Sequence, residues 1–351
     1  MNPESRGAGK LQRASEHVRK YLILYTILSV AIALPIGYHS SGFTIANRGL
    51  LSNLVIFFAI LTIYPSMIQL KTEGFVKSLK SWKQILVSLI YVFVLSPIIA
   101  FGLAPTFGND QIGVGFVTAN IVPASSASLG YVLIAGGSIE LATALAVLSF
   151  VIAIPAIPLL LNFYGSQVST AISTIPVLLS VFYILVLPFA AGQLTRYPLL
   201  RKKGSSFVNK TLRPYLSLAT MLSMLSLIFV LVDKEASVMI SKPRIVGEII
   251  GYQSAIIVGI LIVSILVSRM MHFSYEDHQA VAFISVTKNQ SVAAAIATLA
   301  LNPISALPPA IIPMIQPVIA IIYIHLEKTI KAFFQLPHEQ PLERKHPASS
   351  Q

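Results

Sequence analysis

The stretch Ser285-Val286-Thr287-Lys288-Asn289-Gln290-Ser291 interrupts an otherwise apolar segment that runs from residue 278 to residue 300. A helix needs about 20 mostly apolar residues to cross the hydrocarbon core of a bilayer, and this segment has that length. A lysine at the centre of such a helix costs about 3 kcal/mol on insertion scales, and Lys288 lies too far from both ends to reach the membrane surface. We therefore expect Lys288 to face the protein interior or a wet cavity, with Glu140, Glu248 or backbone carbonyls of a broken fourth span (111–135) as its partner. It has either a role in a binding site or a packing role in a buried ion pair.

The composition of the whole chain places this segment in a polytopic membrane protein. Of its 351 residues, 55% are hydrophobic and only 11% are charged, whereas soluble domains carry about 25% charged residues. We identify ten apolar segments long enough to span a bilayer, and we therefore predict an all-α fold with ten transmembrane helices. These segments are 21–37, 50–69, 84–103, 111–135, 139–163, 170–194, 214–232, 246–268, 278–300 and 304–326.

Lysine and arginine are distributed unevenly between the loops that join these segments. With the N-terminus in the cytoplasm, 20 of the 25 basic residues fall in cytoplasmic segments, 4 fall outside, and Lys288 lies within a span. Because basic loops favour the cytoplasmic side, we predict a multi-pass protein of the cell membrane with both termini in the cytoplasm. The net charge of +12 then reflects topology and not nucleic-acid binding. Binding of anionic lipid is the alternative use of these loops.

The two halves of the chain resemble each other in the placement of proline. The first span ends in residues 33–37 (ALPIG) and the sixth in residues 186–192 (VLPFAAG), while the fifth and tenth each carry two prolines inside the apolar run. Matching spans are five apart, and since five is odd, the second half enters the membrane from the opposite side, as in inverted-repeat transporters. We therefore divide the chain into a cytoplasmic leader (1–20), a first five-helix repeat (21–163), a second, inverted five-helix repeat (170–328) and a cytoplasmic tail (329–351). Within the two ends, 1–16 and 336–351 are polar and are expected to be disordered.

The fourth and ninth spans hold matching places in the two halves and are the least uniformly apolar. The fourth contains Asn120-Ile121-Val122-Pro123-Ala124-Ser125-Ser126-Ala127-Ser128-Leu129-Gly130, in which Pro123 removes an amide hydrogen and obstructs the preceding turn. Paired broken helices at equivalent positions point to the binding site of a transporter. The alternative for the serine run is helix packing, because small residues let helices approach closely. We expect the two spans to cross at their breaks and to bind substrate through Ser125, Ser126, Ser128, Lys288, Asn289, Gln290 and, from span ten, Gln316.

Missing residues exclude several kinds of chemistry. The chain contains no cysteine, which excludes disulfides, zinc–thiolate sites, iron–sulfur clusters and thiol nucleophiles. It also lacks a Ser-His-Asp arrangement, a His-Glu-x-x-His motif and a glycine-rich phosphate loop, so we predict neither an enzyme nor an ATP-driven pump, and no cofactor or metal. The partners that we expect are a small anionic substrate and the lipid bilayer, with no nucleic acid; no oligomeric state is predicted.

Several of these motifs resemble the bile acid:sodium symporter family and the related arsenite permeases of the same superfamily. The resemblance extends over most of residues 20–328, and its best parts are residues 58–65 (FAILTIYP), 123–128 (PASSAS), 134–137 (IAGG), 288–293 (KNQSVA) and 313–317 (PMIQP). It implies ten helices in two inverted five-helix repeats, with broken helices four and nine crossing. It also implies a core domain of spans 3–5 and 8–10, a panel domain of spans 1, 2, 6 and 7, and alternating access at a site between them.

The departures from that family pattern bear on the coupling ion. The family's symporters hold sodium with a Ser-Asn pair in helix four, hydroxyl groups in helix five, and acidic and amide groups in helix nine. In span four, Ser128 matches the serine, but Leu129 occupies the position of the asparagine. In span five, Ala142 and Ala146 replace the hydroxyl residues. In span nine, Ile284 lies near the acidic position and Lys288 occupies the position of an amide ligand. Because sodium prefers oxygen ligands and cannot share a small site with an ammonium group, we expect the charge of Lys288 to substitute for the cation.

We therefore predict a secondary transporter that moves a small organic anion by alternating access without sodium coupling. Transport is then either coupled to protons or a uniport. The alternative within the superfamily is an arsenite or other metalloid efflux permease. Those permeases use a cysteine in helix four, near Ala124 here, and an acidic residue in helix ten where Gln316 stands. From other classes, the alternatives are an intramembrane enzyme or sensor and a channel. The missing catalytic residues weigh against an enzyme, and a single central lysine without a charged ring weighs against a channel.

Overall fold

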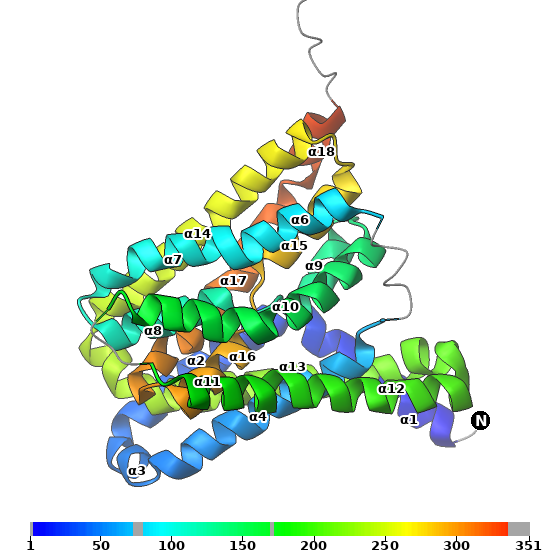
Figure 1. The fold of residues 1–351 in the computed structure, drawn as a ribbon. Helices are drawn as coiled ribbons and strands as arrows, with labels where there is room; N and C mark the ends of the chain where they lie inside the picture. The colour runs from blue at the N-terminus through cyan, green and yellow to red at the C-terminus, as the bar shows by residue number, and fades with distance from the viewer. Residues whose placement is uncertain (1–2, 73–79, 169–171, 336–351) are drawn as a thin grey trace, which may run out of the picture.

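Helices make up nearly all of the computed structural model, which describes residues 3–72, 80–168 and 172–335 (Figure 1). No strand occurs in these ranges, and their single isolated β-bridge joins Ala124 to Lys288. The α-helices are α1 (Pro3–Lys20), α2 (Leu22–His39), α3 (Ser41–Ala46), α4 (Arg48–Gln69), α6 (Trp82–Ile90), α7 (Ser96–Leu103), α8 (Asp110–Ile121), α9 (Ala127–Ile134), α10 (Ile139–Gly165), α11 (Thr174–Val181), α12 (Leu187–Ser206), α13 (Arg213–Ser241), α14 (Pro243–Met270), α15 (Tyr275–Val286), α16 (Gln290–Ala300), α17 (Leu307–His325) and α18 (Glu327–Gln335). Three π-helical turns are η1 (Tyr91–Leu95), η3 (Phe182–Val186) and η4 (Phe207–Leu212), and two 3₁₀ turns are η2 (Ala104–Phe107) and η5 (Pro303–Ala306).

Four long helices, α2, α4, α12 and α13, pack together, and we call them the panel group. The most extensive contacts in the described chain are those of α13 with α4 and α2, followed by α12 with α4. Glycine permits two of the approaches, since a Cβ atom on Gly37 would lie 2.2 Å from the carbonyl oxygen of Asp233 and one on Gly192 would lie 2.5 Å from the Cβ of Met67. Figure 1 shows α4, α12 and α13 across the lower part of the molecule.

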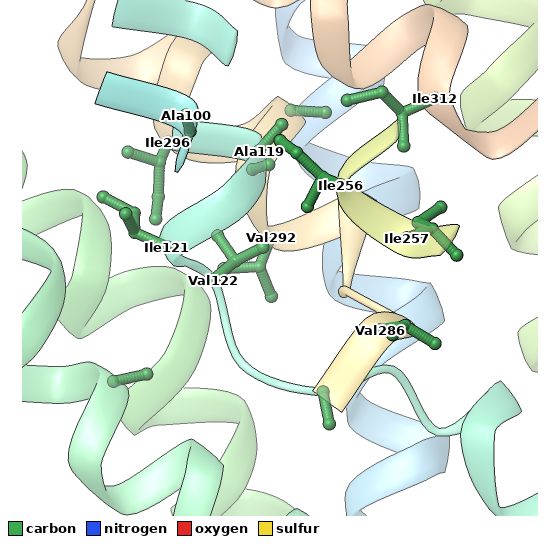
Figure 2. Packing of buried hydrophobic residues seen from close by; sticks show 14 of the residues in the cluster. Ala100, Ala119, Ile121, Val122, Ile256, Ile257, Val286, Val292, Ile296 and Ile312 are labelled. Carbon is green, nitrogen blue, oxygen red and sulfur yellow. The ribbon is translucent and has the colours of Figure 1, made fainter. Parts of the chain in front are cut away.

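A second group, the core group, is made of α6–α10 and α14–α17. Within it α14 packs on α15 and α17, α15 packs on α6, and α8 packs on α7, α10 and α17. Figure 2 shows the apolar packing at its centre, where Val122 and Val292 lie close together and Ile256 lies between them and Ile312. All four side chains are buried, so the centre of the core group is held by close apolar contact.

The two helices expected to be broken are interrupted at the expected places. α8 ends at Ile121 and α9 begins at Ala127, while α15 ends at Val286 and α16 begins at Gln290. The first break contains Pro123, which has no amide hydrogen to continue the helix. The second break ends at Asn289, whose side chain accepts a hydrogen bond from the amide of Val292 and caps α16.

Seven helical stretches of the described chain are long and apolar enough to cross a membrane. They are Leu22–His39, Arg48–Gln69, Trp82–Phe107, Ile139–Gly165, Thr174–Ser241, Pro243–Met270 and Pro303–His325. Predicted spans four and nine do not qualify because each is broken into shorter helices, and predicted spans six and seven form one continuous helical run. The multi-pass helical fold is therefore confirmed, while the ten-helix inverted repeat remains a prediction.

Two details correct the expectations from the sequence. The leader was expected to be disordered over 1–16, but α1 begins at Pro3 and packs against α13. The seventh apolar segment was expected to end at residue 232, but α13 continues to Ser241, so Lys234 lies within a helix and not in an outer loop. Of the predicted tail, 329–335 lies in α18, and 336–351 lies outside the described residues.

Candidate functional site

The two helix breaks meet and pair with each other through their backbones. The amide of Ser125 donates to the carbonyl of Thr287 at 2.8 Å, and the amide of Asn289 donates to the carbonyl of Pro123 at 2.9 Å. These bonds flank the antiparallel bridge between Ala124 and Lys288. Inside a bilayer, backbone groups released by a helix break need partners within the protein. Each break therefore supplies hydrogen-bond partners for the other, and the crossing that the sequence predicts is present.

Lys288 extends from this crossing into the core group. Its side chain is fully buried, and its Nζ donates to the carbonyl oxygen of Val92 at 2.8 Å. Val92 lies in the π turn η1, in which the amide of Ser96 donates to the carbonyl of Tyr91, five residues earlier. In this register the donor for the Val92 carbonyl would be Pro97, which has no amide hydrogen. The π turn and Pro97 together therefore free the oxygen that Lys288 binds.

The two carboxylates proposed from the sequence as partners for Lys288 are not its partners. Glu248 is bound to Arg244 at 2.7 Å, and Glu140 is exposed in the first turn of α10. Among the described residues Lys288 forms no ion pair, so no carboxylate balances the charge of its ammonium form. A free backbone carbonyl was also proposed, but from the broken fourth span, whereas the carbonyl belongs to the third. In the sequence, Pro97 indicates a free carbonyl four residues earlier, at Phe93, and only the π turn shifts it to Val92.

Gln316 of α17 holds the peptide of Lys288 on both sides. Its Oε1 accepts from the backbone amide of Lys288 at 3.0 Å, and its Nε2 donates to the backbone carbonyl of Lys288 at 3.1 Å. The side chain is 8% exposed. Gln316 thus fixes the second break in place, and one lone pair of its Oε1 and one N–H of its Nε2 remain for further hydrogen bonds.

Asn289 and Gln290 lie in the same buried layer. Asn289 caps α16, and Gln290 Nε2 donates to the carbonyl of Ala119 at the end of α8. Two buried oxygens of this layer, Oε1 of Gln290 and Oγ1 of Thr287, have no hydrogen-bond partner within the described residues. Buried polar atoms are normally paired. These two oxygens are therefore unused hydrogen-bond acceptors within the buried layer.

The three serines of the fourth span divide between two environments. Ser128 is buried and its hydroxyl donates to the carbonyl of Ser125, while Ser125 and Ser126 are half-buried. Ser126 Oγ lies 3.2 Å from Ser66 Oγ of α4, and Ser66 Oγ lies 3.4 Å from Thr220 Oγ1 of α13. Ser126 thus faces the panel group, and Ser66 and Thr220 are residues that the sequence reading missed.

The predicted site residues therefore lie around one crossing but on two sides of it. Lys288, Gln316, Asn289, Gln290 and Ser128 are buried inside the core group. Ser125 and Ser126 lie where the core group meets α4 and α13. Within the described residues, no group of three or more histidine, aspartate or glutamate side chains could hold a metal ion.

A multi-pass membrane protein in which two broken helices meet below the surface has the architecture of a secondary transporter. The chain belongs to the sodium bile acid symporter family, whose model matches residues 56–242, more than half of its length. It is 22% identical over 264 residues to the uncharacterized sodium-dependent transporter YocS of Bacillus subtilis, covering 74% of this chain and 78% of that protein. It is also 24% identical over 293 residues to the arsenical-resistance protein Acr3 of Corynebacterium glutamicum, covering 79% of each. The protein is therefore a membrane transporter, and the resemblance stated from its motifs is confirmed.

Proposed function

We propose that this chain is a secondary transporter that moves a small organic anion across the cell membrane by alternating access and without sodium coupling. The proposal covers the ten-span inverted topology with cytoplasmic termini, and motion of the core group against the panel group. The observation that carries it is the buried ammonium group of Lys288, which binds the Val92 carbonyl and has no acidic partner in the described chain.

The charge balance at the crossing favours an anion. α9 and α16 begin there and α8 and α15 end there, so two positive and two negative helix ends meet. These ends largely offset one another, and Lys288 adds one positive charge to them. A substrate with one negative group completes the balance, and the half-buried hydroxyls of Ser125 and Ser126 can donate hydrogen bonds to it.

The side chains around Lys288 weigh against sodium. Sodium sites are built from oxygen ligands, but the buried residues Ala142, Ala146 and Ile284 offer none from their side chains. An ammonium group at hydrogen-bond distance from Val92 occupies the carbonyl that a cation would use. One of the relatives is named as a sodium-dependent transporter. We expect this chain to differ from that relative in not coupling transport to sodium.

Flux measurements with purified protein in liposomes test the proposal. We expect uptake of one class among a panel of small organic anions, with the same initial rate whether or not a sodium gradient is imposed. A strict requirement for the sodium gradient would contradict the assignment of Lys288. Arsenite belongs in the same panel because of the similarity to Acr3; arsenite flux without organic-anion flux would instead identify a metalloid permease.

A further inference from the structure

Besides Lys288 at the crossing, the panel group contains a cluster of three buried charged residues in α13. Asp233, Lys234 and Glu235 follow one another in α13 and are only 8%, 6% and 2% exposed. Glu235 lies six residues before the end of the helix at Ser241, which is about 9 Å along the axis at 1.5 Å per residue. The topology proposed above places this end of α13 on the outer side of the membrane.

Close packing holds this part of α13 against α2. The carbonyl of Asp233 faces Gly37 so closely that any side chain at residue 37 would collide with it. The backbone that carries Glu235 therefore cannot turn freely to expose the carboxyl group. Its burial is a property of the packed helix pair.

The carboxyl group of Glu235 has very few partners. Its Oε1 is buried and accepts no hydrogen bond within the described residues, and the ammonium group of Lys234 lies 4.0 Å away, beyond hydrogen-bond distance. An ionised carboxylate that lacks hydrogen bonds is strongly disfavoured in a buried site. This environment therefore favours the neutral carboxylic acid form of Glu235.

The other charged groups near Glu235 do not change this conclusion. Arg48, the first residue of α4, is exposed and forms no ion pair with Glu235 among the described residues. On α2, the ionisable residue nearest this end is His39, which is exposed. Arg244 and Glu248 in the first turns of α14 bind each other at 2.7 Å. Besides α14, the elements near the core group that touch α13 are α16, η5 and α17, and they contain no aspartate, glutamate, lysine or arginine.

We propose that Glu235 is a proton-binding site that couples the transport cycle to protons. This inference rests on the proposed function and identifies the coupling ion that the function leaves open. Glu235 takes one proton from the outer solution to become a neutral acid and returns it when the surroundings of α13 change. Such a change is available because α13 contacts both the panel group and the core group, so relative motion of the two groups alters the environment of its buried residues.

Infrared difference spectroscopy on the purified protein tests the proton site without any substrate. We expect a carboxylic-acid carbonyl band that persists above the pH at which ordinary glutamates ionise, and that is absent from Glu235→Gln. Glu248→Gln is the matched control, because its carboxylate is already bound to Arg244 and should not contribute to the band. A band of equal intensity in wild type and Glu235→Gln would overturn the proposal.

Flux in liposomes then tests coupling. An inward proton gradient should raise wild-type anion uptake several-fold, whereas Glu235→Gln should retain exchange of substrate across the membrane and lose this stimulation. If wild-type flux ignores the proton gradient, Glu235 is not a coupling site although the proposed function stands. If wild type moves no organic anion at all, the proposed function fails, and the infrared band alone decides whether Glu235 holds a proton.

Discussion

At the scale of single residues, Lys288 shows how a charge can be retained at membrane depth. Its ammonium group makes one charge-assisted hydrogen bond to Val92, and such bonds contribute about 1.5–3 kcal/mol. The cost of a central lysine on insertion scales is about 3 kcal/mol. The two magnitudes nearly cancel, so the lysine adds little to stability, and its charge is explained better by a ligand than by folding.

This balance predicts the behaviour of Lys288→Met. Removing the charge also removes its desolvation cost, so the thermal midpoint of the detergent-solubilised protein should change little. Anion flux should fall at least about tenfold, which corresponds to 1.4 kcal/mol of lost stabilisation. Lys288→Gln is the control, because an amide can still donate to the Val92 carbonyl but carries no charge. If both variants transport like wild type, Lys288 does not belong to the site.

At the scale of the element, the third predicted span is shaped by one proline. η1 spans Tyr91–Leu95 and Pro97 follows it by two residues, while η3 spans Phe182–Val186 and Pro188 follows it by two residues. In a π turn each carbonyl accepts a hydrogen bond from the amide five residues later. In both places that residue is a proline for one carbonyl, and proline has no amide hydrogen to donate. Lys288 uses the first free carbonyl, Val92, whereas no side chain of the described residues donates to the second, Tyr183.

Pro97→Ala should therefore act on transport through Lys288. The new amide can donate to the Val92 carbonyl and compete with the ammonium group, and one backbone hydrogen bond contributes about 1 kcal/mol to stability. We expect a higher thermal midpoint together with reduced anion flux. Pro188→Ala is the matched control, since it restores an amide beside a carbonyl without a side-chain partner and should stabilise the protein without the loss of flux. Equal effects of the two substitutions on flux would contradict the role of Val92.

At the scale of the whole molecule, the sequence predicts the crossing but not what surrounds it. The breaks were predictable because Pro123 and the polar run at 285–291 violate the apolar pattern locally. The partner of Lys288 was not, because it is a backbone atom whose availability depends on a helix register. Ser66 and Thr220 were missed because single hydroxyl residues in apolar helices usually serve packing. The buried Asp233–Glu235 cluster was missed because three charged residues normally mark the end of a span.

Alternating access requires the core group to move relative to the panel group, and the absence of cysteine in the chain makes this testable. Ser66 and Ser126 face each other across the two groups with their hydroxyl oxygens 3.2 Å apart. In the double variant Ser66→Cys/Ser126→Cys, oxidation to a disulfide should abolish anion flux in liposomes, and reduction should restore it. Ser66→Cys/Thr220→Cys is the matched control, because these two short side chains have their hydroxyl oxygens 3.4 Å apart on α4 and α13, both of the panel group. Its oxidation should leave flux unchanged. Full flux through the oxidised Ser66–Ser126 variant, with the disulfide confirmed by mass spectrometry, would show that transport does not require these two groups to separate.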